Sequence, residues 1–324
     1  MFTGVLCERE GLALKMSSLE GVDYICSYEY PFEVTGGGGK RWIQLLPHVF
    51  RMDTALSLDE RADGVLVRSY DELMYVLSEG YRGEIVADSG LYTMNNAALQ
   101  SLLEEGVTRA VCPPELNFRE LLDRGGADRS ELVLYGRSAL MISANCTYKN
   151  STSVTKYRHA CLTECRPAAL SSVADGRPST PSSALHVDIH SAQSLSTFSD
   201  RSTSTKKCAG AGQERIQFYV NLTDRKRTDF PVLCDCRYCY NVIYNSVPTS
   251  LHKAMDKVLE LSPASVRLDF TTEDLGSAMA VTKYYVNLIR NLESESRPGG
   301  KGTKTAVPKE LEKFTYGHFK NGVE

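Results

Sequence analysis

The chain has 324 residues, of which 37 are Lys or Arg and 40 are Asp or Glu, so the formal net charge is −3. With 42% apolar and 24% charged residues, the composition excludes a wholly disordered chain, a collagenous repeat and a uniformly basic nucleic-acid coat. No stretch approaches the roughly 18 uninterrupted apolar residues of a membrane span, and the first residues do not resemble a signal peptide. We therefore expect a cytoplasmic protein with no membrane partner.

The first 145 residues alternate between strand-like and helix-like patterns. Short apolar runs predict strands at 42–50, 64–67, 84–87, 109–112 and 131–135. Helical patterns separate them at 69–77, 94–105 and 115–123, and Ser69 is a candidate cap of the first of these helices. Successive strands lie about 20–25 residues apart, which favours parallel strands joined by crossover helices. The pattern fits an α/β fold, either a barrel or a doubly wound sheet.

The regular pattern stops in a segment rich in Ser and Thr. Residues 171–210 contain 11 Ser and 4 Thr, so we expect a disordered insertion there. Regular patterns then resume, with strands at 216–222 and 265–270 and helices at 251–261 and 272–293. Residues 294–305 have the composition of a flexible linker.

Seven of the ten cysteines fall within about a hundred residues and suggest a metal site. Cys236 and Cys239 form a C-x-x-C pair, while Cys146 and either Cys161 or Cys165 can complete four thiolate ligands. The spacing alone does not separate zinc from an iron–sulfur cluster, and free buried thiols are the alternative. Three earlier cysteines, at 7, 26 and 112, are expected to be small buried side chains.

Two charged motifs are further candidates. Arg267 and Asp269 alternate on one predicted strand, so both point the same way from its carboxyl end. Arg267 there can clamp a carboxylate or a phosphate, or form an internal salt bridge with Asp269 or Glu273. The run DRKRTD at 224–229 can contact phosphate, although a solvated turn is favoured. No local signature of a serine, papain-like or zincin protease is present.

Several segments together resemble the collagenase-like peptidase family U thirty-two. They are DGVLVRSYDEL, EIVADSGLYTMNNAAL, PPELNFREL, ELVLYGRSALMISANC, NLTDRKRTDFPVLCDCRYCYNVIYNSVPTSL and ASVRLDFTTED. The closing YGHFKNGVE is similar to the C-terminal signature of long clostridial-type members, in which Arg is more frequent at the position of Asn321.

The resemblance implies a TIM-barrel-like α/β core and a four-cysteine iron–sulfur site, most simply a 4Fe–4S cluster. Its ligands would be Cys146, Cys161, Cys236 and Cys239, with zinc as the alternative. The family label implies peptidase activity on a protein or peptide, while other members are similar to oxygen-independent hydroxylases of RNA bases or small aromatic precursors. A non-catalytic barrel with structural zinc is the third alternative.

For substrate binding we expect Arg267, Asp269 and Asn245, with Arg267 holding an anionic small-molecule co-substrate. We divide the chain into a poorly assigned segment at 1–40, barrel units at 41–165, the disordered insertion at 166–214, the rest of the barrel at 215–293, and a linker and tail at 294–324. Only seven strands can be placed, so the expected barrel is incomplete at its N-terminal side. The oligomeric state is not indicated by the sequence.

Overall fold

The computed structural model describes residues 2–9, 11–32, 39–50, 57–144, 186–188, 217–235, 238, 240–295 and 306–322. The chain divides into two compact units. The barrel unit comprises Met1–Ser138 and Val247–Glu324, and the inserted unit comprises Ala139–Ser246.

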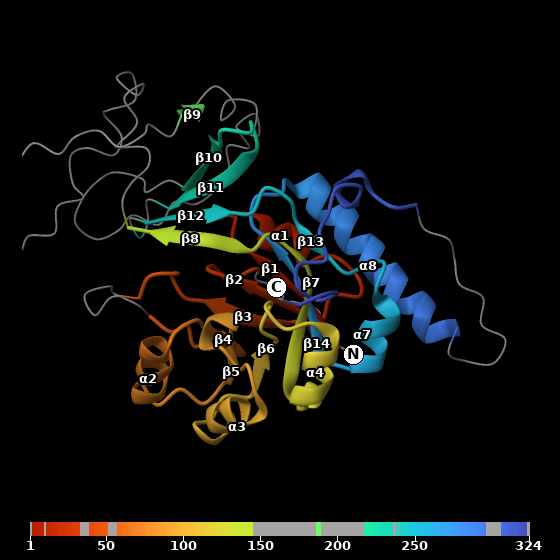
Figure 1. Ribbon diagram of the computed structural model, residues 1–324. Helices are drawn as coiled ribbons and strands as arrows, with labels where there is room; N and C mark the ends of the chain where they lie inside the picture. The colour runs from red at the N-terminus through yellow and green to blue at the C-terminus, as the bar shows by residue number, and fades with distance from the viewer. Residues whose placement is uncertain are drawn as a thin grey trace, which may run out of the picture. The chain divides into compact units, whose positions relative to one another are not determined.

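Eight parallel strands form a closed ring in the barrel unit (Figure 1). In chain order they are β1 (Phe2–Cys7), β2 (Tyr24–Ser27), β3 (Arg41–Leu45), β4 (Gly64–Val67), β5 (Glu84–Ala87), β6 (Arg109–Val111), β7 (Ser130–Gly136) and β14 (Ser265–Phe270). Each pairs with the next, and β14 closes the ring by pairing with both β7 and β1. A short strand, β13 (Thr249–Ser250), adds antiparallel to β7. The fold is therefore an α/β barrel of the TIM type.

The ring is complete, which corrects the expectation of an incomplete barrel. The strands that sequence reasoning missed, β1 and β2, lie in the segment 1–40. Strand β2 has four residues, all buried, and so shows no alternation between apolar and polar positions. Because strands of a barrel are covered on both faces, such short segments carry little periodic signal.

Helices lie outside the ring (Figure 1). They are α1 (Leu12–Met16), α2 (Tyr70–Ser78), α3 (Asn96–Glu104), α4 (Phe118–Arg124), α7 (Met255–Leu261) and α8 (Leu275–Glu295), with short 3-10 turns η1 (Ser89–Leu91), η2 (Ala127–Arg129) and η3 (Lys309–Leu311). The predicted cap of α2 is confirmed, because the Ser69 hydroxyl accepts the Glu72 N–H at 3.3 Å. Helix α4 begins with a reciprocal capping box between Asn117 and Glu120. None of the helices in the described ranges is long and apolar enough to cross a membrane.

The apolar core has two layers, one inside the ring and one between the ring and the helices. The inner layer consists of buried side chains that alternate along the strands, and its members are Leu6, Tyr24, Cys26, Ile43, Leu45, Leu66, Val86 and Val111. The neighbouring residues on β1, Val5 and Cys7, instead pack outward in the larger core beneath the helices. Side chains therefore fill the ring, and polar groups that point inward are buried unless they lie near an end.

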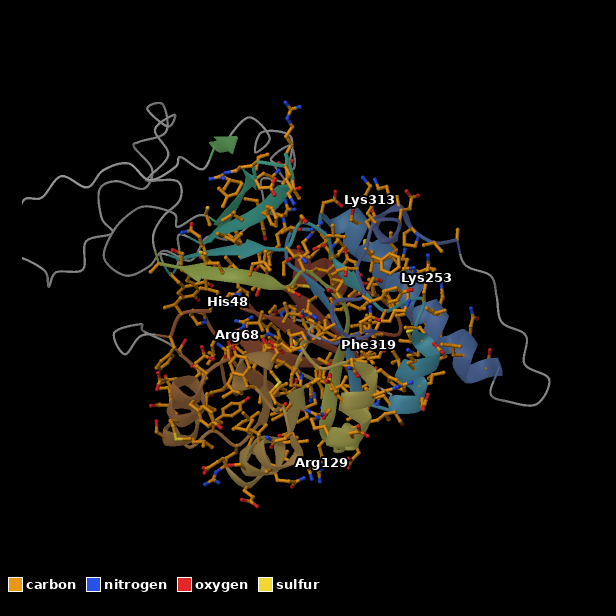
Figure 2. All side chains as sticks on the ribbon, viewed as in Figure 1. His48, Arg68, Arg129, Lys253, Lys313 and Phe319 are labelled. Carbon is orange, nitrogen blue, oxygen red and sulfur yellow. The ribbon has the colours of Figure 1, made fainter. Side chains whose placement is uncertain are left out.

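The last described segment, 306–322, packs on the barrel unit. Leu311 and Phe319 are buried in its outer core, and Phe319 is labelled in Figure 2. The backbone N–H of Ser250 donates to Thr315 O at 2.8 Å, and that of Phe118 donates to Phe319 O at 2.9 Å. This part of the expected tail is thus an integral piece of the barrel unit.

The inserted unit is a five-stranded antiparallel sheet. Its strands, in order across the sheet, are β8 (Ala139–Ser143), β12 (Tyr240–Tyr244), β11 (Asp229–Asp235), β10 (Gln217–Thr223) and β9 (His186–Asp188). Of the predicted disordered insertion at 166–214, the structure describes only 186–188, which form β9 and pair with β10. The rest of that range lies outside the described residues.

Candidate active site

Charged side chains gather where the barrel strands end. Glu8 follows β1, Arg68 follows β4 and Asp88 follows β5, while Asp269 is the penultimate residue of β14. The carboxyl ends of parallel strands meet at one end of a barrel, which is where enzymes of this fold carry their active sites. These residues share one end of the ring, and three of them are acidic while Arg68 is basic.

Arg267 is the centre of this group. Its side chain is 2% exposed, and it contacts three carboxylates. Nη1 lies 2.9 Å from Glu131 Oε1, and Nη2 lies 3.2 Å from Asp88 Oδ1. Nε and Nη2 hold the two oxygens of Asp269 at 2.6 and 3.0 Å. Arg267 thus forms an internal salt bridge with Asp269, one of the two alternatives offered by the sequence.

Glu273, the other expected partner of Arg267, has different contacts. Its Oε1 accepts the hydroxyl of Tyr135 at 3.0 Å, and its Oε2 accepts the backbone N–H groups of Thr271 and Thr272 at 3.0 and 3.1 Å. These bonds hold the chain that leaves β14 and fix the direction in which the carboxyl end of the strand continues.

Glu131 anchors the group deeper inside the ring. It is fully buried, and besides Arg267 it accepts the Tyr24 hydroxyl at 2.5 Å, the Ser265 hydroxyl at 2.9 Å and Arg109 Nε at 2.9 Å. Burial alone would raise the pKa of Glu131, but Arg267 and Arg109 hold it below its usual value. Glu131 is therefore a carboxylate at every physiological pH and serves to compensate two buried arginines.

Asp88 and Asp269 share the guanidinium of Arg267, but their pKa values are shifted in opposite directions. Burial raises the pKa of Asp269 to about 6, in spite of its contacts with Arg267. For Asp88 the effect of burial is exceeded by that of Arg267 and Arg68, so its pKa lies below the usual value. Their side chains are 15% and 18% exposed, more than Arg267 or Glu131. Two neighbouring carboxyls whose pKa values are pushed apart are typical of acid–base sites.

Arg68 is a second cation in this group at the carboxyl end of the barrel, which we call the barrel mouth. Arg68 Nε lies 3.4 Å from Asp88 Oδ2, and Arg68 Nη2 lies 3.1 Å from Glu8 Oε1. The same oxygen of Glu8 lies 2.6 Å from His48 Nε2. Figure 2 shows His48 and Arg68 side by side, while Arg129, which precedes β7, lies at the opposite end of the barrel. The charges thus form one chain from His48 through Arg68 and Asp88 to Asp269.

The described residues bring together only part of the predicted site. Arg267 and Asp269 lie at the barrel mouth, whereas Asn245 follows β12 in the inserted unit. The expected ligands Cys146, Cys161, Cys236 and Cys239, and the alternative Cys165, lie outside the described residues. In the ranges that are described, no three His, Cys, Asp or Glu side chains are grouped as a metal site. Cys7, Cys26 and Cys112 are buried as expected, and burial raises their pKa values.

Sequence reasoning missed most of the charged group, including Glu8, His48, Arg68, Asp88 and Glu131. A signal for three of them does exist, because a charged residue directly follows a buried run in VLCE, VLVR and IVAD. In a parallel barrel, the residue after such a run lies at the mouth. Glu131 gave no such signal, since it lies inside a strand.

A Ser–His pair in the barrel unit bears on the peptidase alternative. His252 Nδ1 lies 2.8 Å from Ser250 Oγ, which lies 2.7 Å from the hydroxyl of Tyr285. Tyr285 in turn donates to Leu134 O at 2.9 Å. Because the carbonyl can only accept, Tyr285 donates to it, Ser250 donates to Tyr285, and His252 donates from Nδ1 to Ser250. This is the reverse of a Ser–His pair in which the imidazole accepts the proton of the nucleophile.

Fold and site together place this chain among the β/α-barrel proteins with a charged, mostly buried network at the carboxyl end of the barrel. No protein-family model, no curated protein and no solved structure matches the chain.

Proposed function

We propose that this protein is a β/α-barrel enzyme in which Asp269 exchanges a proton with a substrate bound at the carboxyl end of the barrel. The observation that carries the proposal is the pair Asp88 and Asp269, which both lie within 3.2 Å of Nη2 of Arg267. The pKa of Asp88 is lowered and that of Asp269 is raised. With a pKa of about 6, Asp269 is present in both protonation states near neutral pH. It can therefore take up a proton and return it, as general acid–base catalysis requires.

Arg267 then has a positioning role, in place of the expected clamp on an anionic co-substrate. Its side chain is 2% exposed, and its nitrogens contact Glu131, Asp88 and Asp269. A substrate anion would have to displace one of these carboxylates. We therefore assign to Arg267 the orientation of Asp88 and Asp269, whose oxygens are the more exposed groups.

For the reaction we propose an oxygen-independent hydroxylation of an RNA base or of a small aromatic precursor, in line with the resemblance to peptidase family U thirty-two. We propose water as the oxygen source and an external two-electron acceptor as the oxidant. Ring hydrogen and water then give the ring hydroxyl, two electrons that pass to the acceptor, and two protons, one of which is the ring proton. Asp269, as carboxylate, is the group that accepts it in this proposal. Asp88, whose pKa is lowered, stays ionised and keeps Arg267 in place.

We further propose that Cys146, Cys161, Cys236 and Cys239 hold an iron–sulfur cluster. Support comes from the described residues that flank them: Asp235 and Tyr240 are cross-strand partners, as are Asn241 and Ser143. Cys146 is three residues from Ser143 in the chain, and the C-x-x-C pair lies between Asp235 and Tyr240. At roughly 3.5 Å per residue, three of the four cysteines can reach one end of this sheet. A bound cluster would supply electron transfer or Lewis-acid chemistry.

The test of the cluster is metal and sulfide analysis of protein purified without oxygen. We expect iron and acid-labile sulfide with broad visible absorption, both lost in Cys236→Ala and both kept in the matched variant Cys208→Ala. Zinc in colourless protein would contradict the hydroxylase and support the structural-zinc alternative. Peptide cleavage that persists after removal of all metal would support a peptidase instead. Asp269→Asn should keep the cluster and lose turnover, which separates the two parts of the proposal.

A further inference from the structure

The hairpin that joins β10 to β11 carries three consecutive cations at its tip. Arg225, Lys226 and Arg227 are all exposed, and none of them forms an ion pair with the described part of the chain. This local charge contrasts with the net charge of −3 for the whole protein. The tip therefore offers a compact positive surface.

Short hydrogen bonds fix the shape of this tip. The carboxylate of Asp224 accepts the backbone N–H groups of Lys226 and Thr228 at 2.7 and 2.8 Å, and its own N–H donates to Thr228 O at 3.0 Å. Asp229 accepts the hydroxyl of Thr223 at 2.6 Å. The two acidic residues thus close the turn, and an external anion would meet the three cations on a rigid support.

The backbone of Arg227 adds a second observation. Its φ is 62°, in the left-handed region where glycine or asparagine is the usual choice. Arginine in place of glycine at this turn position puts a third cation directly beside Arg225 and Lys226.

We infer that this hairpin tip binds the phosphate backbone of an RNA substrate. Phosphates repeat along a strand whatever its sequence, so a short basic tip can bind them without a groove. A membrane surface is the poorer partner, because residues 223–229 contain no apolar side chain that could enter it. The inference rests on the proposed function in one respect: it selects RNA over the small aromatic precursor as the substrate class.

The experiment measures binding of a short fluorescein-labelled RNA to the full chain by fluorescence anisotropy across a salt series. The test variant combines Arg225→Gln, Lys226→Gln and Arg227→Gln. The matched control combines Arg82→Gln, Arg129→Gln and Lys283→Gln, which removes three exposed cations from the barrel unit and changes the net charge equally. A third variant, Arg225→Lys with Arg227→Lys, keeps the charge of the tip. Thermal unfolding of each variant verifies that it is folded.

We expect the test variant to bind RNA at least about tenfold more weakly, with the slope of log affinity against log salt reduced by about 2, since each lost phosphate contact contributes about 0.7. The control and the Lys variant should bind like the unchanged protein. Equal weakening in test and control variants, or no weakening in either, would overturn the inference. So would a loss confined to binding of phosphatidylserine vesicles.

Catalytic failure is distinguishable from failure of this surface. If the unchanged protein yields no product but binds RNA, and the hairpin variant binds RNA about tenfold more weakly, the proposed function fails and the hairpin inference stands. If product forms while the hairpin variant binds and turns over RNA normally, the reverse holds.

Discussion

Glu131 and Arg267 form an ion pair inside the barrel, with 2.9 Å between Oε1 and Nη1 and with side chains that are 1% and 2% exposed. The pair links the interior of the ring to its mouth, because the same guanidinium holds Asp88 and Asp269. Charges at this depth are retained only when each is compensated, so removal of one member leaves the others unpaired. The stability of the barrel and the geometry of the mouth therefore depend on the same contacts.

Glu131→Gln should destabilise the barrel strongly. The substitution keeps the shape of the side chain but removes the charge that compensates Arg267 and Arg109. We expect the free energy of unfolding to fall by about 3–5 kcal/mol, as measured by urea unfolding. Glu104→Gln, at an exposed position on α3, should change it by no more than about 0.5 kcal/mol. A loss below about 1 kcal/mol for Glu131→Gln would show that the arginines find other partners.

The pKa of Asp269 should lie well above that of an ordinary aspartate. In protein with carbonyl-labelled aspartate, one carboxyl resonance should move with a midpoint near pH 6 and be missing from Asp269→Asn. The pKa of Asp269 in the folded protein lies above the ordinary value of 3.8. The contribution of Asp269 to stability is therefore fully present below pH 3.8 and is lost as the pH rises through about 6. A midpoint near 4 would remove the basis for its acid–base role.

His252 should make the stability of the folded protein depend on pH in the direction opposite to that of Asp269, over much of the same pH range. Burial lowers its pKa from 6.5 to about 4, so the unfolded chain takes up a proton before the folded protein does. Stability should fall as the pH decreases from about 6.5 to about 4, by on the order of 2–3 kcal/mol.

The matched variant for this prediction is His252→Asn, which can still donate to Ser250 but does not titrate. The difference in unfolding free energy between the two proteins, measured from pH 7 to pH 4, isolates the histidine from Asp269. An unchanging difference across this range would contradict the lowered pKa.

Gly4→Ala should be poorly tolerated because of Tyr24. A Cβ at position 4 would overlap the ring of Tyr24, whose hydroxyl binds Glu131. We expect a loss of about 1–3 kcal/mol from overpacking, read from thermal or urea unfolding. The control Gly276→Ala, near the start of α8, meets only the Asp274 carboxylate at 3.4 Å and should be neutral or slightly stabilising. Equal effects of both substitutions would show that Tyr24 can move without penalty.

The parts of the fold that are predictable from sequence are those with long or repeated patterns. Strands β4 to β7 and β14 and helices α2, α3 and α8 follow from apolar runs and caps close to where they occur. Strands β1 and β2 do not, because β2 is four residues long and the ring buries both faces. What closes the ring is pairing between β1 and β14, at opposite ends of the chain, which no local pattern encodes.

The candidate site, too, is predictable only where its residues are close together in the sequence. The adjacency of Arg267 and Asp269 follows from strand alternation, and the structure has them in contact. The partners that define the environment of Arg267, Glu131 and Asp88, are 136 and 179 residues away in sequence. Only the closed ring brings them together. The cysteine ligands remain a prediction from spacing and resemblance.

The most direct test is the nucleoside composition of RNA from cells that lack this gene, compared by mass spectrometry with RNA from cells supplied with the unchanged protein or with Asp269→Asn. We predict that one nucleoside lacks an oxygen atom in the deletion and that the unchanged protein restores it. Asp269→Asn, present at equal level and with its cluster intact, should not restore it. Full restoration by Asp269→Asn would contradict the proposed acid–base role of Asp269, and RNA that does not change on deletion would contradict RNA as the substrate.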